Sequence, residues 1–304
     1  MDVVAASLGV YDLAWTLTLP KMVELSCEAV PDATGAPARG TYLETARMLV
    51  DRTPAGMRAT TEHGAAIDGS FTDNGERWLM RVPREVSDRG LLWEIEDLLS
   101  LVLTTGWRRA GWVPLHAAGL TDGRRGIVVC ASGGGGKTTL TMAMARAGWM
   151  SLGDDKLLLR ADGGQPMIGA LKHMLNVDPA VDAWFPEVGD LRGLPEYSAS
   201  TVKRRVSLAS LWPDSAASSM RPTTIVSLER RPGAGTFAVQ PMDGAARIAT
   251  LLRQTVIPTD PDQARWITRE LAACAGKAAG VRLIVGDDAY VDPGSIARVV
   301  QELS

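Results

Sequence analysis

Residues 126–140 read GIVVCASGGGGKTTL, and this stretch decides the fold. The apolar run at 127–130 predicts a buried parallel strand. A glycine-rich turn at 132–136 follows it, and Lys137 opens a helix with apolar residues on its later turns. A strand, a glycine loop and a helix in this order are typical of a phosphate-binding P-loop. A flexible linker is the alternative, but linkers do not sit between a strand and a helix.

Each part of this loop has a chemical task. Glycines allow backbone N–H groups to curl around phosphate oxygens, and the helix N-terminus adds partial positive charge. Lys137 is expected to reach the β and γ phosphates of ATP, and the Thr138 hydroxyl is expected to hold Mg²⁺. Ala131 stands where the pattern G-x4-G-K-[ST] has its first glycine. The residues predicted to bind the nucleotide are Ser132, Gly133, Gly134, Gly135, Gly136, Lys137, Thr138 and Thr139.

Composition excludes several classes of protein. The chain has 304 residues, of which 46% are hydrophobic, enough for a real core and two domains. Its net charge of −3 argues against a nucleic-acid partner. Three widely spaced cysteines give neither a zinc motif nor a disulfide framework. The N-terminal segment lacks a signal-peptide pattern and no apolar run has membrane-spanning length, so we expect a cytoplasmic protein without a membrane partner. The sequence leaves open whether the protein forms a homo-oligomer.

Two domains are predicted, with a boundary near residue 108. Residues 1–108 form a β-rich module of unknown role, and residues 109–304 form an α/β domain with a mixed sheet. In the first domain we expect strands at 14–19, 22–30 and 77–82, a loop at 31–37 and a helix at 88–105. In the second we expect a strand at 112–120, a hairpin of 156–160 with 166–170, strands at 224–228, 236–240 and 281–285, and helices at 245–254, 264–275 and 294–303. Residues 171–222 read as irregular, with a basic cluster at 203–205.

Two acids and a histidine accompany the loop. Asp154 and Asp155 follow the P-loop helix and one short strand, and strand ends of an α/β sheet meet at the ligand crevice. One aspartate is predicted to join Thr138 as a Mg²⁺ ligand, and the other to accept a proton from an attacking hydroxyl. The pair does not say which residue has which role, and a solvated Gly-Asp-Asp turn is the alternative. His116 lies on the preceding apolar strand, as a pocket residue or as a core side chain.

The three motifs together resemble the catalytic domain of HPr kinase/phosphorylase and its relatives. They are L-H-A-A-G-L at 115–120, A-S-G-G-G-G-K-T-T at 131–139 and L-G-D-D-K at 152–156, and the resemblance covers 109–304. It implies a PEP-carboxykinase-like P-loop domain with His116 and the Asp pair beside the phosphates. Some relatives act as tailoring kinases in ribosomal-peptide pathways, including lasso-peptide clusters. The family's loop continues Gly-Lys-Ser-Glu, whereas this one has Thr138 and Thr139 after the lysine.

The function favoured by the sequence is a Mg²⁺-ATP-dependent kinase. It is expected to use His116, Lys137, Asp154 and Asp155 in transfer of the γ-phosphoryl group to a hydroxyl. The acceptor is a Ser or Thr of a peptide or protein, or a small-molecule alcohol. A ParA-like ATPase switch is one alternative, although Ser132 occupies the place of that loop's signature lysine. A relative that only binds nucleotide is another.

Overall fold

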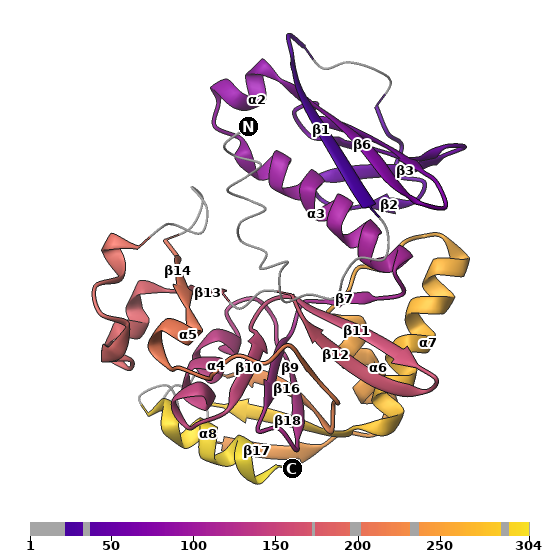
Figure 1. Cartoon of the computed structure of the whole chain (residues 1–304). Helices are drawn as coiled ribbons and strands as arrows, with labels where there is room; N and C mark the ends of the chain where they lie inside the picture. Colours follow the sequence, from indigo (N-terminus) through magenta and orange to yellow (C-terminus); the bar gives the residue numbers. More distant parts are fainter. Residues whose placement is uncertain are drawn as a thin grey trace. The chain divides into compact units, whose positions relative to one another are not determined.

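The computed structural model describes residues 22–32, 37–171, 174–194, 202–231, 237–286 and 292–303, which divide into two compact units (Figure 1). The described part of the first unit ends at Trp112 and also contains Ile257–Ile267, while the second contains Val113–Val256 and the residues from Thr268 onward. Each unit has its own hydrophobic core. Among the helices described, none is long and apolar enough to cross a membrane.

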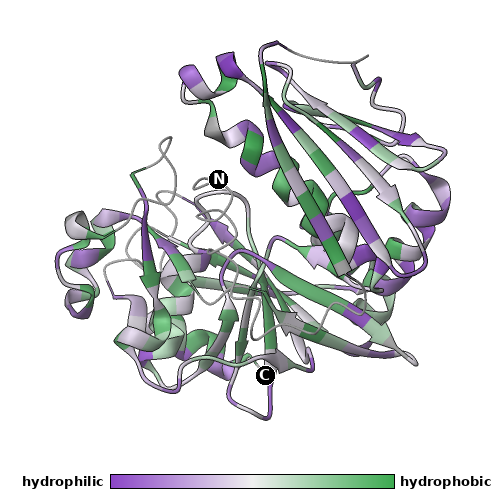
Figure 2. Cartoon of the chain, turned by 45° about the horizontal axis from the view of Figure 1, so that its top comes forward, coloured by the Kyte–Doolittle hydropathy of each residue, from purple (hydrophilic) through white to green (hydrophobic). Residues whose placement is uncertain are grey.

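A six-stranded sheet forms most of the first unit. Side by side, its strands are β1 (Met22–Val30), β6 (Gly75–Pro83), β5 (Ala66–Phe71), β4 (Gly56–Thr61), β3 (Met48–Thr53) and β2 (Leu43–Glu44). Buried and half-exposed residues alternate along β3 and β4, and hydrophobic and hydrophilic residues both occur along these strands (Figure 2). The strands predicted at 22–30 and 77–82 are confirmed. The strand predicted at 14–19, and residues 33–36 of the predicted loop, lie outside the described residues.

Two helices follow this sheet. They are α2 (Arg84–Asp88) and α3 (Leu92–Arg109), and α3 packs its apolar face into the core of the first unit. The predicted helix at 88–105 exists but begins later, because Gly90 with a φ of 66° ends the preceding turn. The buried residues of α3 recur at helical spacing, as Ile95, Leu98, Leu99 and Val102.

A mixed six-stranded sheet is the centre of the second unit. Side by side, its strands are β10 (Met150–Gly153), β8 (Ala118–Thr121), β9 (Gly126–Cys130), β16 (Thr224–Arg230), β18 (Ala279–Val285) and β17 (Phe237–Pro241). Strands β9, β16 and β18 are parallel, and β8 and β17 run antiparallel to their neighbours. Every residue of β9 is buried, which confirms the predicted buried parallel strand.

Four longer helices belong wholly or partly to this unit. They are α4 (Lys137–Arg146), α6 (Gly244–Leu252), α7 (Pro261–Lys277) and α8 (Pro293–Glu302), and the first residues of α7 belong to the first unit. Leu140 and Met144 of α4 and Ile296 of α8 share the core with the sheet. The predicted helices after the glycine loop and at 245–254, 264–275 and 294–303 are therefore confirmed, as are the strands at 224–228 and 281–285. The strand predicted at 236–240 is confirmed from residue 237 onward, because residue 236 lies outside the described residues.

A second sheet corrects one prediction. Its strands are β15 (Ser219–Met220), β12 (Gln165–Ala170), β11 (Leu157–Asp162) and β7 (Val113–Leu115). The predicted hairpin is confirmed by β11 and β12. The strand predicted at 112–120 is wrong as a single element, because β7 pairs with β11 whereas β8 pairs with β9 and β10. Strands β7 and β8 are both mainly buried and apolar. The pattern of apolar residues therefore does not show that the chain changes sheet at residues 116–117.

The segment predicted as irregular, 171–222, is also partly wrong. Strand β13 (Met174–Val177) pairs antiparallel with β14 (Arg204–Ser207), and α5 (Leu208–Leu211) follows. Between the strands lie short 3₁₀ helices at Pro179–Ala183, Pro186–Val188 and Leu191–Gly193. Two four-residue strands that pair across such a long stretch of sequence produce no local pattern of apolar residues. Residues 172–173 and 195–201 of the predicted segment lie outside the described residues.

Gly126 supports the start of β9 through a close backbone approach. A Cβ added there would lie 2.1 Å from the carbonyl oxygen of Arg221, and the Gly126 oxygen accepts a 2.7 Å hydrogen bond from the Thr223 amide. We expect Gly126→Ala to lower the free energy of unfolding by about 1–3 kcal/mol, because the backbone must shift. Chemical denaturation measures this. The control is Gly276→Ala in α7, where nothing lies within 4 Å of an added Cβ. Equal stability of both variants would contradict the prediction.

Candidate functional site

The glycine loop joins the buried end of β9 to the first turn of α4. Gly134 and Gly136 have φ values of 73° and 91°, which L side chains rarely adopt. Gly136 is the N-cap of α4 and gives no side-chain hydrogen bond to the helix, and the first turn carries no acidic residue. The amide groups of this turn are therefore not capped by a side chain of their own N-cap, and the helix end is electrostatically suited to an anion.

Lys137 lies inside the loop rather than in solvent. It is only 8% exposed, and its Nζ donates to the Ala131 carbonyl oxygen at 3.0 Å and lies 3.1 Å from Nε2 of His116. Burial lowers the pKa of Lys137 below its usual value, and the neighbouring carboxylates of Asp155 and Asp154 oppose part of that effect. The ammonium group is thus held at one place in the loop with little water around it.

The chain passes from one sheet of the second unit to the other at two places, and these two crossings bring His116 and the acidic pair together. His116 lies between β7 and β8, and Asp155 lies between β10 and β11. The flanking strands are paired on both sides, with Gly119 opposite Gly153 in one sheet and Leu115 opposite Leu157 in the other. The two crossing segments are consequently fixed side by side, and Nδ1 of His116 lies 2.8 Å from Oδ1 of Asp155.

The two adjacent aspartates face different partners. Asp154 is buried, with 4% exposure, and its Oδ2 accepts a hydrogen bond of 2.5 Å from the hydroxyl of Thr138. Asp155 is 20% exposed at its side chain and pairs with His116 instead. The interpretation of Gly-Asp-Asp as a merely solvated turn does not fit these contacts.

The contacts of His116 indicate which of its two ring nitrogens carries the hydrogen. A lysine ammonium donates hydrogen bonds and accepts none, so Nε2, next to Lys137, carries the lone pair. Nδ1 then carries the hydrogen and donates it to Asp155. The backbone amide of His116 donates to the carbonyl oxygen of Gln254 at 2.6 Å, which holds this segment on the other side. Its side chain is 53% exposed, so His116 is not a core residue.

Residues near Thr138 fit a divalent ion of the magnesium type. A hydroxyl and a carboxylate oxygen meet there, and Mg²⁺ takes few protein ligands of this hard-oxygen kind beside phosphates and water. Within the described residues, no cluster of three or more His, Cys, Asp or Glu could hold a metal by itself. The donor set therefore fits an ion that arrives with a phosphate ligand better than a resident metal.

Two cavities flank the glycine loop. One, of about 460 Å³, is lined by all the residues predicted for the site, since it contains His116, the loop from Ser132 to Thr139, Asp154 and Asp155. Sequence reasoning missed other lining residues, which are Asn176, Asp178, Ala180, Val181, Trp184 and Arg230. They come from segments that the sequence presents as irregular or as a plain strand. Of the basic cluster at 203–205, Lys203 lines this cavity, while Arg204 and Arg205 lie on β14.

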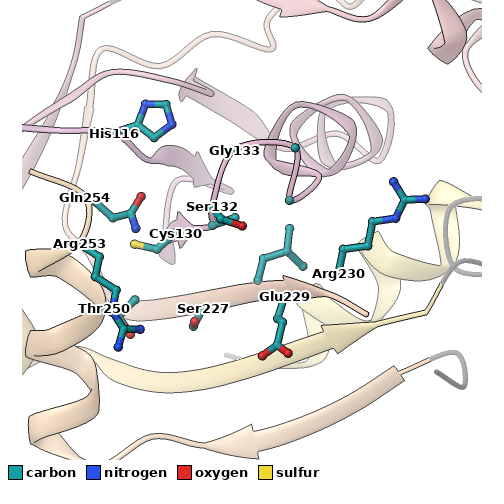
Figure 3. A pocket seen from close by; sticks show the side chains of 14 residues that line it. His116, Cys130, Ser132, Gly133, Ser227, Glu229, Arg230, Thr250, Arg253 and Gln254 are labelled. Carbon is teal, nitrogen blue, oxygen red and sulfur yellow. The ribbon is translucent and has the colours of Figure 1, made fainter. Parts of the chain in front are cut away.

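The second cavity, of about 840 Å³, lies on the other side of the loop (Figure 3). It shares His116, Ser132–Gly135 and Arg230 with the first cavity. Its remaining walls come from the end of β9 with Ala131, from the end of β16, and from Thr250, Arg253 and Gln254 at the end of α6. Asp154, Asp155, Lys137 and Thr138 are not among its lining residues. Of the remaining histidines, His63 pairs with Glu94 in the first unit, and His173 lies outside the described residues.

Comparison with known proteins gives one kind of match. No protein-family model matches the sequence, and no curated protein matches it. A solved structure of the HPr(Ser) kinase/phosphatase from Coxiella burnetii is similar, with 10% sequence identity and a TM-score of 0.33 over 62% of this chain and 94% of that chain. The structure resembles an HPr(Ser) kinase/phosphatase. At this identity the roles of individual residues have to come from the contacts of this chain.

Proposed function

We propose that this protein is a kinase that transfers the γ-phosphoryl group of Mg²⁺-ATP to a hydroxyl group. The observation that carries the proposal is the separation of the two aspartates around Lys137, with Asp154 on Thr138 and Asp155 on His116. These contacts support a metal ligand and a proton acceptor on two adjacent residues after β10, in the cavity that the glycine loop also lines. Phosphoryl transfer needs these two functions next to bound phosphates.

The glycine loop and Lys137 bind the phosphates in this proposal. Backbone amides of the loop and of the first turn of α4 surround the phosphate oxygens, and Lys137 neutralises charge on the β and γ groups. Little water surrounds the lysine ammonium, so its attraction to a phosphate is screened less than at an exposed site. Thr139, also buried, lies one residue further along this turn.

Thr138 and Asp154 hold the metal ion. A Mg²⁺ ion held by these two side chains would supply positive charge that neutralises the phosphates. The hydrogen bond between Thr138 and Asp154 keeps both oxygens oriented toward one place before the ion arrives. The contact with Thr138 supports Asp154, rather than Asp155, as the metal ligand in this proposal.

Asp155 is the general base, and His116 positions it. The Nδ1–H of His116 donates to one carboxylate oxygen of Asp155, which fixes the carboxylate at the edge of the cavity. Asp155 takes the acceptor's proton while the acceptor oxygen bonds to the γ phosphorus. The bond from that phosphorus to the β–γ bridging oxygen breaks, and ADP leaves. His116 also lies beside Lys137, so its ring connects the base to the phosphate-binding lysine.

The acceptor enters the cavity that contains Asp155. Trp184 and Lys203 line the same cavity, so an apolar surface and a positive charge accompany the base. We propose a Ser or Thr hydroxyl of a peptide or protein, or a small alcohol, as the acceptor class. Nucleic acid and membrane have no part in the proposal.

Phosphate transfer to a chemically defined panel tests this function. The protein is incubated with Mg²⁺ and ATP labelled at the γ-phosphate, together with Ser-containing and Thr-containing peptides and small alcohols. We expect labelled product with at least one member, and no label when Mg²⁺ is removed by a chelator. The Asp155→Asn protein is the control for contaminating kinases. Binding of ATP without transfer to any acceptor or to water would favour a nucleotide-binding protein instead.

A further inference from the structure

The larger cavity is lined by a side-chain amide group that makes no hydrogen bond within the described part of the protein. The side chain of Gln254, at the end of α6, lines this cavity and is only 9% exposed as a residue. Within the described residues its amide makes no hydrogen bond, because the contacts of Gln254 there are made by its backbone. Figure 3 shows the amide pointing into the hollow between His116 and Cys130. The amide is therefore accessible from the cavity and available to hydrogen-bond a ligand there.

The geometry of phosphoryl transfer decides which part of the reactants reaches this cavity. Attacking and leaving oxygens lie roughly in line on opposite sides of the γ phosphorus. The attacking oxygen must lie beside Asp155, which lines only the smaller cavity of the two. The remainder of the donor therefore extends away from Asp155. The glycine loop borders both cavities, so a chain of phosphates along it leads from one to the other.

The lining of the larger cavity suits a flat heteroaromatic base. Cys130, Ala131 and Leu228 give it an apolar part, and burial raises the pKa of the Cys130 thiol to about 12, so this group is uncharged. Ser227 and Thr250 add hydroxyl groups, and Arg253 adds an exposed guanidinium. An amide at the edge of an apolar hollow can donate to one ring position and accept from the next, which is how Gln pairs with N7 and the N6 amino group of adenine.

We propose that this cavity is the nucleoside site and that Gln254 makes it selective for adenine. The proposal rests on the proposed function, since it requires a nucleoside triphosphate on the glycine loop. Guanine presents acceptors at both N7 and O6, so it cannot donate the hydrogen bond that the adenine amino group donates to the Gln254 oxygen. Gln254 is therefore a specificity-determining residue and takes no part in the transfer step.

Calorimetric titration with ATP, GTP and inorganic tripolyphosphate tests the proposal. We expect the wild-type protein to bind ATP at least about tenfold more tightly than GTP and tripolyphosphate, the factor expected for one or two lost hydrogen bonds. Gln254→Leu should abolish most of the preference for ATP over GTP while leaving the affinity for tripolyphosphate unchanged. Its backbone carbonyl, which accepts from the amide of His116, is retained. Gln254→Glu, which has nearly the same shape, still accepts from the adenine amino group and repels both acceptors of guanine, so it should keep the preference for ATP over GTP.

The control is Gln240→Leu on the exposed strand β17, which should bind all three ligands as the wild type does. An unchanged ATP-to-GTP ratio in Gln254→Leu, or loss of the preference in Gln254→Glu, would overturn the proposal and leave the kinase assignment intact. Equal affinity of the wild type for ATP and tripolyphosphate would overturn it in the same way. Failure of the wild type to bind any of the three ligands would instead refute the proposed function, and the nucleoside site with it.

Discussion

Asp155→Asn is expected to keep the affinity for Mg²⁺-ATP and to lose phosphoryl transfer by about 10²- to 10⁴-fold, the usual contribution of a general base. Asparagine can still accept the hydrogen bond from Nδ1 of His116, so the fold of this segment should be retained. It cannot take the proton of the attacking hydroxyl. The loss should therefore appear in kcat, because the interaction is made only in the transition state.

Asp154→Asn is the matched control, since it makes the same chemical change one residue away. This variant should need more Mg²⁺ for half-maximal activity, because its carboxylate faces Thr138 and the proposed metal position. Single-turnover transfer, ATP affinity and Mg²⁺ dependence are measured for both proteins. Identical profiles of the two variants would contradict the division of roles. Wild-type transfer rates in both would refute the roles assigned to the two aspartates.

Lys137→Ala is expected to weaken ATP binding by about 10- to 100-fold, corresponding to roughly 1.5–3 kcal/mol for a hydrogen bond to a charged group. The effect should be near the upper end because the ammonium is only 8% exposed. Lys137→Met keeps most of the apolar stem and separates loss of charge from loss of packing. Lys277→Ala, at the exposed end of α7, removes a lysine outside the site and should leave binding unchanged.

The pH dependence of ATP affinity, measured in the same titrations, is a second test of the role of Lys137. Burial holds the pKa of this lysine below its usual value, and a bound phosphate favours the charged form and so raises the pKa. Affinity for ATP is then greatest below the lowered pKa of Lys137 in the free protein and falls as pH rises through that pKa. The Met variant should show no such fall. Undiminished ATP affinity in both Lys137 variants would rule out phosphate binding by this loop.

Local pattern was sufficient for most elements of the second unit. The buried strand, glycine loop and helix at 126–146 follow from neighbouring residues, because each part has its own period and punctuation. The errors all concern pairing between distant segments. The chain changes sheet at His116 within one apolar run, and β13 pairs with β14 across a stretch rich in proline, glycine and serine.

The sequence by itself determined the chemistry available to this protein, namely a lysine and a threonine after a run of glycines, two adjacent aspartates and a histidine. Tertiary structure alone decided how they are divided. The paired crossings between two sheets direct Asp155 to His116, while the end of β10 directs Asp154 to Thr138. Gln254 could not be found from sequence motifs, because it too depends on tertiary contacts. Its position depends on α6 ending beside His116, a contact between residues far apart in sequence that no local periodicity encodes.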